Sequence, residues 1–357
     1  MPNGPLLHES LTALPKLLAG CGSFLFVRDP IAWESSGAAA ALERELASLG
    51  GVPFEEQGSE PRLEKMQAAA ALAETKACRV IVAVGGGTSI DTAKGAAWCM
   101  AGGALEARPA PETPLLPLFA VPTTAGTGSE ATHFAVCWHE GRKHSLADSR
   151  LLPAHAIVDS NLHLSLSPHL TATAGFDALC QALESIWSCG ATESSRKDAI
   201  QAAQLLLGAL EGAVTQPSPE LRRAMARGAH LAGRAINVTK TTTPHALSYA
   251  LTHEHGIPHG YAVGLTFSHC LALRHTRKTS PPGTDLVTKL LASTPEAAVA
   301  RFQKLPERCG APTRLAALGV KEADLDVIAT SVDPSRLAND PLDPSAPELL
   351  AILRSAL

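Results

Sequence analysis

The sequence is poor in aromatic side chains and in charge: of its 357 residues, 4% are aromatic and 18% are charged. No run reaches about 18 uninterrupted apolar residues, which argues against a membrane span. The formal net charge of −4 excludes a sequence-wide basic surface for nucleic acid. The first twenty residues lack the basic start and the small-residue cleavage pattern of a signal peptide. We therefore expect a cytoplasmic protein that binds neither nucleic acid nor a membrane.

Paired cysteines are also missing. The eight cysteines are scattered with no CxxC spacing, so we expect ordinary buried thiols rather than disulfides or a metal cluster. Hydrophobic residues make up 45% of the chain, which is ample for a buried core. The length suggests two domains of roughly 150 residues each.

The two halves of the chain differ in pattern. Up to about residue 160, short apolar runs alternate with Ala-rich stretches, which indicates parallel βαβ units. The predicted strands are 23–27, 79–84, 117–122 and 156–159, and the predicted helices are 35–49, 63–76 and 90–100. Later stretches have apolar spacings of three and four, which predict helices at 172–188, 194–210, 221–238, 261–273 and 347–357. We predict an α/β domain over residues 1–162, with a Rossmann-like parallel sheet, and an all-helical domain over residues 163–357.

A glycine-rich segment, VAVGGGTSIDTAK, reads as a strand, three glycines and the start of a helix at residues 82–94. Glycines let backbone N–H groups approach an anion, and the helix N-terminus adds unpaired donors, so a diphosphate would fit. A tight βα turn is the alternative. A second Gly/Thr segment, VPTTAGTGSEAT at 121–132, also follows a strand. Two such loops at the carboxyl ends of strands would flank one crevice, which favours a nucleotide-binding site.

Asp29 follows the first predicted strand directly. A carboxylate there could accept hydrogen bonds from an adenosine ribose and would repel a 2′-phosphate, which favours NAD over NADP. The adjacent Arg28 weakens this inference, and a solvated loop aspartate remains the alternative.

Four residues of the second half form a candidate metal site. Asp177 and Gln181 are four apart and therefore share one helix face. His245 and His259 lie on either side of a Gly/Pro break, so His259 opens a new helix. A carboxylate, an amide oxygen and two imidazoles would suit a divalent first-row metal ion. Capping or surface histidines are the alternative.

Four motifs in this order, GGGTSIDTAK, PTTAGTGSE, LTATAGFDAL and HGIPHG, resemble those of the iron-dependent (group III) alcohol dehydrogenases over nearly the whole chain. The resemblance implies an N-terminal dinucleotide-binding domain and an all-helical C-terminal domain, the architecture shared with dehydroquinate synthase, with metal and nicotinamide meeting between them. It implies NADH or NADPH as cofactor, Fe²⁺ as the usual metal with Zn²⁺, Mn²⁺ or Co²⁺ as alternatives, and a possible homodimer. The implied diphosphate contacts are Gly85, Gly86, Gly87, Thr88 and Ser89, the further cofactor contacts are Thr123 and Thr124, and the implied metal ligands are Asp177, His245 and His259.

Two positions depart from the family pattern. Gln181 stands where the family has a histidine, and Tyr249 stands where a second histidine is common. An amide oxygen is a weaker donor than imidazole, so metal affinity should be lower. We still expect a bound metal, with a metal-free nucleotide-binding protein as an alternative.

The same departures resemble the branch of the family that reduces phosphonoacetaldehyde to 2-hydroxyethylphosphonate. The resemblance lies in two segments, DAL-x-QA-x-ES-x-WS followed by TESSRKDA, and N-x-TKTTTPHA-x-SY-x-LT. A phosphonate needs cations and hydroxyl donors, which Lys240 and the threonines at 241–243 would supply; Arg234 and the Arg196–Lys197 pair are weaker candidates. Lys240 as a helix C-cap, with the threonines in a turn, is the alternative.

The implied reaction is hydride transfer from the nicotinamide to an aldehyde carbonyl that the metal polarises as a Lewis acid. Tyr249 or His255 would start the proton relay. Other readings remain open: a reductase of another short aldehyde, an oxidiser of a diol, or a metal- and NAD-using lyase of the dehydroquinate synthase type.

Overall fold

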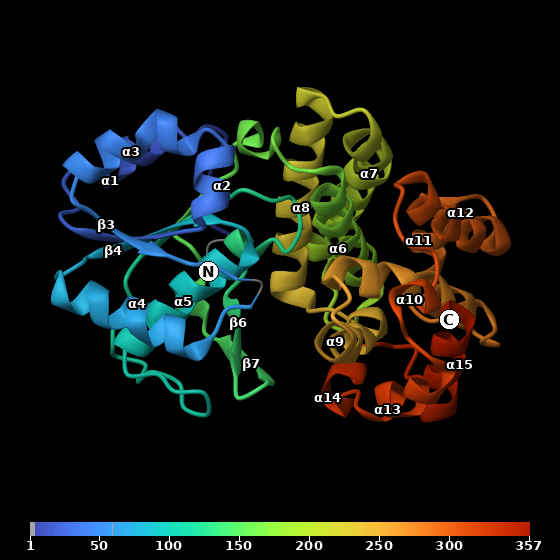
Figure 1. The fold of residues 1–357 in the computed structure, drawn as a ribbon. Coiled ribbons are helices and arrows are strands. Elements are labelled where there is room, and N and C mark those ends of the chain that lie inside the picture. The colour runs from blue at the N-terminus through green and yellow to red at the C-terminus, as the bar shows by residue number, and fades with distance from the viewer. Residues whose placement is uncertain (1–3, 59) are drawn as a thin grey trace. The chain divides into compact units, whose positions relative to one another are not determined.

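The computed structural model describes residues 4–58 and 60–357 and divides into two compact units, with the division between Leu166 and Ser167. The sequence placed this boundary after residue 162. Figure 1 shows strands in the first unit and helices throughout the second. Within the described residues, no helix is long and apolar enough to cross a membrane.

The first unit is built on a six-stranded sheet in which all neighbouring strands are parallel, in the order β1-β8-β5-β4-β2-β3. A separate antiparallel hairpin follows β5. The sheet strands are β1 (Leu6–His8), β2 (Phe24–Arg28), β3 (Gly51–Glu55), β4 (Val80–Gly85), β5 (Leu118–Pro122) and β8 (His155–Ile157), and the hairpin strands are β6 (Phe134–His139) and β7 (Arg142–Ala147).

Helices cover both faces of this sheet. Successive residues of a strand point to opposite faces, so Leu25 and Ile81 pack toward one helix layer while Phe24 and Val80 pack toward the other. The unit therefore has three layers, which explains why its central strands are apolar throughout. The helices are α1 (Ala13–Leu18), α2 (Pro30–Ser35), α3 (Ala38–Ser48), α4 (Leu63–Thr75) and α5 (Gly87–Met100), with 3₁₀ turns at Ser129–Ala131, Ser149–Leu151 and Ser160–His163.

Three features of this unit differ from the prediction. The helix expected at 35–49 is divided at Gly37, whose φ of 79° suits glycine, and the chain is already helical from Pro30. The edge strands β1 and β3 were not predicted, because β1 has three residues and β3 contains Pro53, which an edge strand tolerates. The β6–β7 hairpin was also missed, since its strands alternate polar and apolar side chains only in part.

The second unit is helical. Its three longest helices begin at side-chain caps followed by proline or by polar residues: Ser167, Thr192 and Ser218 each accept a backbone N–H in the first turn. The helices are α6 (Pro168–Trp187), α7 (Glu193–Thr215), α8 (Pro219–Thr239), α9 (Thr243–His255), α10 (His259–His275), α11 (Thr284–Leu291), α12 (Pro295–Arg308), α13 (Leu325–Thr330), α14 (Pro334–Leu337) and α15 (Ala346–Ala356), with 3₁₀ turns at Ala316–Leu318 and Glu322–Asp324.

The break between α9 and α10 has a local cause. Gly256 ends α9 with φ of 65°, a left-handed conformation that glycine adopts without strain, and Pro258 precedes the first residue of α10. His259 therefore opens a new helix, as the sequence predicted.

All eight cysteines are free. Five are buried, as expected, but Cys189 is exposed because it lies in the turn between α6 and α7.

Candidate functional site

The glycine segment joins the end of β4 to the start of α5. β4 ends at Gly85, Gly86 is the N-cap, and α5 begins at Gly87, three residues earlier than predicted. No side chain within the described part of the chain caps this helix, so its first backbone N–H groups are left for another acceptor. Thr88 and Ser89 lie in the first turn of the helix. An uncapped N-terminus after a parallel strand is a typical anion-binding element.

The two Gly/Thr loops lie side by side. Gly85 of β4 is paired in register with Pro122 of β5, and the backbone N–H of Thr123 donates to the Gly85 carbonyl over 2.9 Å. A Cβ at Gly87 would lie 2.8 Å from the Thr127 side chain, and one at Gly86 would lie 3.5 Å from Thr124 Oγ1. Glycine is therefore required at 87 for the second loop to pack against the first.

Asp29 lies beside this loop, but one of its oxygens is already used. It is the N-cap of α2, and its Oδ1 accepts the backbone N–H groups of Ile31 and Ala32 at 2.9 and 3.0 Å. The neighbouring Arg28 contacts two carboxylates, Glu43 at 2.8 Å and Glu55 at 3.4 Å. The positive charge that weakened the inference from Asp29 is thus balanced by acidic partners.

A buried polar network ties the second loop to α5. Lys94 Nζ donates to Ser129 and Thr132, and Asp91 accepts from the Ser129 hydroxyl at 2.5 Å. Burial lowers the pKa of Lys94 to about 8, although the Asp91 and Glu130 carboxylates oppose it. Sequence reasoning gave Asp91 and Lys94 no role, yet both belong to the GGGTSIDTAK motif, and they hold the loop after β5.

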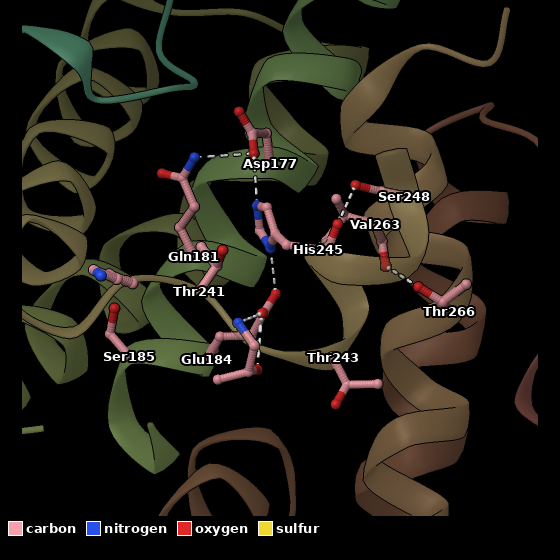
Figure 2. A network of polar contacts seen from close by, with 12 residues as sticks. Asp177, Gln181, Glu184, Ser185, Thr241, Thr243, His245, Ser248, Val263 and Thr266 are labelled. Carbon is pink, nitrogen blue, oxygen red and sulfur yellow. Dashed lines mark hydrogen bonds and ion pairs between the residues drawn. The ribbon is translucent and has the colours of Figure 1, made fainter. Parts of the chain in front are cut away.

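In the second unit, three helices bring together one carboxylate and two imidazoles. Asp177 lies on α6, His245 on α9 and His259 at the start of α10. One potential ligand atom from each residue lies within 4.8 Å of the others. The Nε2 atoms of His245 and His259 face Asp177 Oδ1 at 3.2 and 3.7 Å. Figure 2 shows His245 between Asp177 and Glu184.

The other ring nitrogen of His245 is held by Glu184. Glu184 is fully buried, and its Oε1 lies 2.5 Å from His245 Nδ1. Its Oε2 accepts from the backbone N–H and the hydroxyl of Thr242. Burial alone would lower the pKa of His245, but the Glu184 and Asp177 carboxylates outweigh it and raise this pKa to about 10. The two carboxylates therefore stabilise a positive charge at His245 or beside its Nε2 atom.

His259 is oriented by Ser248. The Ser248 hydroxyl donates to the His245 carbonyl over 2.7 Å, so its oxygen accepts from His259 Nδ1 at 3.3 Å. This fixes the proton of His259 on Nδ1 and leaves the Nε2 lone pair toward Asp177. With Nδ1 of both histidines held by acceptors, the two Nε2 atoms and Asp177 form a donor set that suits a divalent metal ion.

Gln181 lies one turn after Asp177 and is buried. Its amide nitrogen donates to Asp177 Oδ1 over 3.0 Å, and its buried Oε1 has no hydrogen-bond partner among residues 4–58 and 60–357 (Figure 2). An unpartnered buried carbonyl oxygen beside a carboxylate and two imidazoles fits a fourth metal donor, provided that the amide turns.

Gly260 allows α10 to approach α6. A Cβ at Gly260 would lie 1.8 Å from the Thr173 carbonyl oxygen and 3.1 Å from the Asp177 backbone nitrogen. Both are backbone atoms, so any side chain at this position would push His259 away from Asp177.

Tyr249 and His255, the predicted proton-relay residues, differ in position. The Tyr249 ring stacks on His259 with centroids 6.0 Å apart, which places the phenol beside the donor set. His255 lies in the last turn of α9, and among the described residues no hydrogen bond, ion pair or ring contact joins it to Asp177, His245 or His259.

The TKTTTPH segment is arranged differently from the expected phosphonate grip. Lys240 is exposed and is the C-cap of α8, with φ of 56°. Thr242 bonds Glu184, and Thr243 donates its hydroxyl to Asp340 at 2.6 Å. The expectation that these two threonines offer hydroxyls to a substrate was therefore wrong, because both hydroxyls bond buried carboxylates. The arrangement of cap and turn matches the alternative reading of this segment.

Glu184, Ser248 and Arg336 were missed as site residues. Glu184 lies seven residues after Asp177, and therefore on the same helix face, which is the one sequence signal that pointed to it. Ser248 reaches the histidines through tertiary contacts that the sequence does not reveal, and Arg336 contacts Tyr249, to whose hydroxyl its Nη1 donates over 3.0 Å.

A parallel α/β unit followed by an all-helical unit with a mixed carboxylate–imidazole donor set defines a class of two-domain enzymes. Residues 6–160 match the family described as iron-containing alcohol dehydrogenase, and residues 171–357 match the C-terminal domain of the same family. The chain belongs to the iron-containing alcohol dehydrogenase family and is an oxidoreductase.

Three relatives show how close the likeness is. The phosphonoacetaldehyde reductase of Streptomyces viridochromogenes is 37% identical over 256 residues, a match that spans 65% of this chain and 65% of that protein. The sulfoacetaldehyde reductase from Bifidobacterium kashiwanohense, solved in complex with NAD⁺, is 27% identical, with a TM-score of 0.85 and coverage of 99% and 96% of the two chains. A solved 1,3-propanediol oxidoreductase is 28% identical, with a TM-score of 0.87 over 99% and 98%.

Proposed function

We propose that this protein reduces phosphonoacetaldehyde to 2-hydroxyethylphosphonate with NADH and a divalent metal ion, Fe²⁺ by the habit of the family. The observation that carries the metal-dependent chemistry is the convergence of Asp177, His245 and His259 on one point. The relatives named phosphonoacetaldehyde reductase and sulfoacetaldehyde reductase support the substrate class. Both substrates are two-carbon aldehydes that end in an anion.

The metal would be held by Asp177 Oδ1 and by the Nε2 atoms of His245 and His259, with Gln181 Oε1 as a further donor. A bound divalent ion supplies Lewis-acid polarisation of the aldehyde carbonyl. Glu184 and Ser248 keep the two imidazoles in the tautomer that presents Nε2, which is the role of residues that support metal ligands in general.

The cofactor would be held by the loops after β4 and β5. The backbone at Gly85, Gly86 and Gly87 and the hydroxyls of Thr88 and Ser89 would contact the diphosphate, and Thr123 and Thr124 would contact the rest of the dinucleotide. The nicotinamide supplies the hydride. We expect NADH rather than NADPH, because Asp29 repels a 2′-phosphate and Arg28 is paired with Glu43 and Glu55.

The alcohol oxygen needs a proton after hydride transfer. Tyr249 is the better placed of the two candidates, because its ring stacks on His259. His255 would act only through water. Lys240 stays a candidate contact for the phosphonate, although the neighbouring hydroxyls of Thr242 and Thr243 are not available to a substrate.

The test is NADH oxidation measured by absorbance with phosphonoacetaldehyde and, separately, with acetaldehyde, with and without added Fe²⁺. We expect Fe²⁺-dependent oxidation that is faster with the phosphonate and slower when NADPH replaces NADH. Substrate turnover without net NADH consumption would instead indicate a lyase of the dehydroquinate synthase type. Metal-independent binding of NADH with no turnover would indicate a nucleotide-binding protein.

A second candidate is the oxidation of a short diol or the reduction of another short aldehyde. The likeness to a 1,3-propanediol oxidoreductase favours it. Reduction of NAD⁺ with 1,3-propanediol, at a kcat/KM above that for phosphonoacetaldehyde in the reverse direction, would favour this function over the first.

A further inference from the structure

A substrate that carries a phosphonate needs a fixed cation near the point where its carbonyl binds. The sequence offered Arg234, the Arg196–Lys197 pair and Lys240 for this role. Arg234 pairs with Asp198 at 3.0 Å, and Arg196 donates through Nε to the Ile186 carbonyl. Lys197 and Lys240 are exposed, and Lys240 is the C-cap of α8. A further cation, Arg336, was not predicted from the sequence.

Arg336 is joined to the donor set through one aromatic ring. Its guanidinium carbon lies 4.4 Å from the centre of the Tyr249 ring, and its Nη1 donates to the Tyr249 hydroxyl over 3.0 Å. The Tyr249 ring in turn stacks on His259, with an angle of 17° between the ring planes. The three side chains therefore form a stack, here called the column, in which the candidate metal ligand His259 is followed by the Tyr249 ring and then by the Arg336 cation.

The guanidinium keeps hydrogen-bonding capacity for an anion. Arginine has five N–H donors, and within residues 4–58 and 60–357 the structure commits one of its terminal nitrogens, Nη1, to Tyr249. Arg336 Nε also forms an ion pair with Asp333 at 4.0 Å, a separation longer than a hydrogen bond, and the Asp333 side chain is 55% exposed. The side chain of Arg336 is itself 35% exposed, so an anion from solvent can reach it.

We infer that Arg336, held in place by Tyr249, binds the anionic group of the aldehyde substrate and sets the preference for charged over neutral aldehydes. This inference rests on the proposed function. The substrate has the same order as the column: a carbonyl oxygen at one end, a methylene carbon, and an anion at the other end. Arginine suits the task because its planar N–H groups match two oxygens of a phosphonate or sulfonate at once.

The test compares aldehydes that differ in charge and share a shape. Phosphonoacetaldehyde is a dianion, and 3,3-dimethylbutanal is its neutral analogue with a tert-butyl group in place of the phosphonate. Steady-state kinetics would be measured on the metal-loaded protein for the wild type, Arg336→Ala and Arg336→Lys. Arg354→Ala is the matched control, because Arg354 pairs with Glu322 on the surface of the same unit.

For Arg336→Ala we expect the KM for phosphonoacetaldehyde to rise by roughly 10- to 100-fold, the loss of a charge-assisted hydrogen bond. The KM for 3,3-dimethylbutanal should stay within about twofold, since a neutral group makes no such bond. Arg336→Lys should fall between the two, and Arg354→Ala should match the wild type. Competitive inhibition by methylphosphonate should weaken in Arg336→Ala in parallel with the KM. If Arg336→Ala raised the KM for sulfoacetaldehyde more than the KM for phosphonoacetaldehyde, the role of Arg336 would be supported and sulfoacetaldehyde would be the better substrate assignment.

Equal loss on the charged and the neutral aldehyde would overturn the inference, because it would mean that Arg336 only supports Tyr249. A selective loss in Lys240→Ala with none in Arg336→Ala would overturn it in favour of Lys240. A wild type that turns over both aldehydes equally would overturn the phosphonate substrate itself. That failure is visible before any substitution is made and is therefore distinct from a failure of Arg336.

Discussion

The glycine loops of the first unit and the donor set of the second are built in opposite ways. The loops consist of two short contiguous segments whose backbone groups and small side chains make the site. The donor set takes one residue from each of three helices and depends on side chains outside the motifs, Glu184 and Ser248, for its orientation. A site made of contiguous segments can be recognised from the sequence, whereas a site made of residues from several helices depends on how those helices pack.

The largest expected effect comes from removing a ligand of the distributed site. His245→Ala should abolish stoichiometric metal binding and lower kcat/KM by about 10³-fold or more, since the Lewis acid supplies several kcal/mol. NADH binding to the first unit, followed by fluorescence, should be unchanged. Elemental analysis checks the metal content, and His253→Ala, an exposed histidine on the same helix, is the control. Full metal content in His245→Ala would break the distinction between the two sites.

The second largest effect is expected from disturbing the packing of α10 against α6. Gly260→Ala should destabilise the protein by about 3 kcal/mol or more and release the metal, because its Cβ would overlap the Thr173 carbonyl. Gly208→Ala is the matched control: no atom lies within 4 Å of a Cβ there, so it should stabilise α7 by about 0.5–1 kcal/mol. Urea unfolding measures both. Equal stability of the two variants would show that α10 does not need its close approach to α6.

The third effect is expected from removing the carboxylate that orients the metal ligand His245. Glu184→Gln should weaken metal binding by about 10- to 100-fold, because a neutral amide holds His245 Nδ1–H less strongly than a carboxylate. The measurement is a competition titration against a chelator of known affinity. A variant that unfolds no more easily than the wild type but loses metal would separate orientation from packing, whereas unchanged affinity would remove Glu184 from the account.

The pH dependence of metal binding also distinguishes the metal site from the glycine loops. In the metal-free protein the carboxylates raise the pKa of His245 to about 10, so its bound proton stabilises the fold fully below its ordinary pKa, and this contribution is lost as the pH rises through 10. A metal ion must displace that proton. Between pH 6.5 and 10, binding should therefore release a proton, and affinity should rise by up to about tenfold per pH unit.

Calorimetric titrations with Co²⁺ in two buffers of different ionisation enthalpy count the released protons. Dinucleotide binding to the first unit needs no such proton, so NADH affinity should change much less over the same range. Metal binding with no proton release would contradict the assigned protonation of His245.

Much of the fold was predictable. Periodicity identified the parallel α/β half and the helical half, and the Gly/Pro interruption identified the helix break before His259. The parts it missed have physical reasons. Gly37 divides one expected helix, Pro53 interrupts the pattern of an edge strand, and the β6–β7 hairpin lacks alternation because β6 is mostly apolar and β7 is mostly polar.

The three candidate metal ligands could be predicted from the sequence, but the residues that contact them could not. Motif resemblance named Asp177, His245 and His259, and the helices bring their side chains together. The two threonines at 242 and 243 were misread, because nothing local reveals that Glu184 and Asp340, far along the chain, accept their hydroxyls. Arg336 was invisible for the same reason.

We propose that Asp177, His245 and His259 share one metal ion. Anomalous diffraction at the iron edge, from crystals of the Fe²⁺-loaded protein, would locate that ion. We expect one peak within bonding distance of Asp177 Oδ1 and of both Nε2 atoms. A peak elsewhere in the chain, or none at this point in fully active crystals, would contradict it.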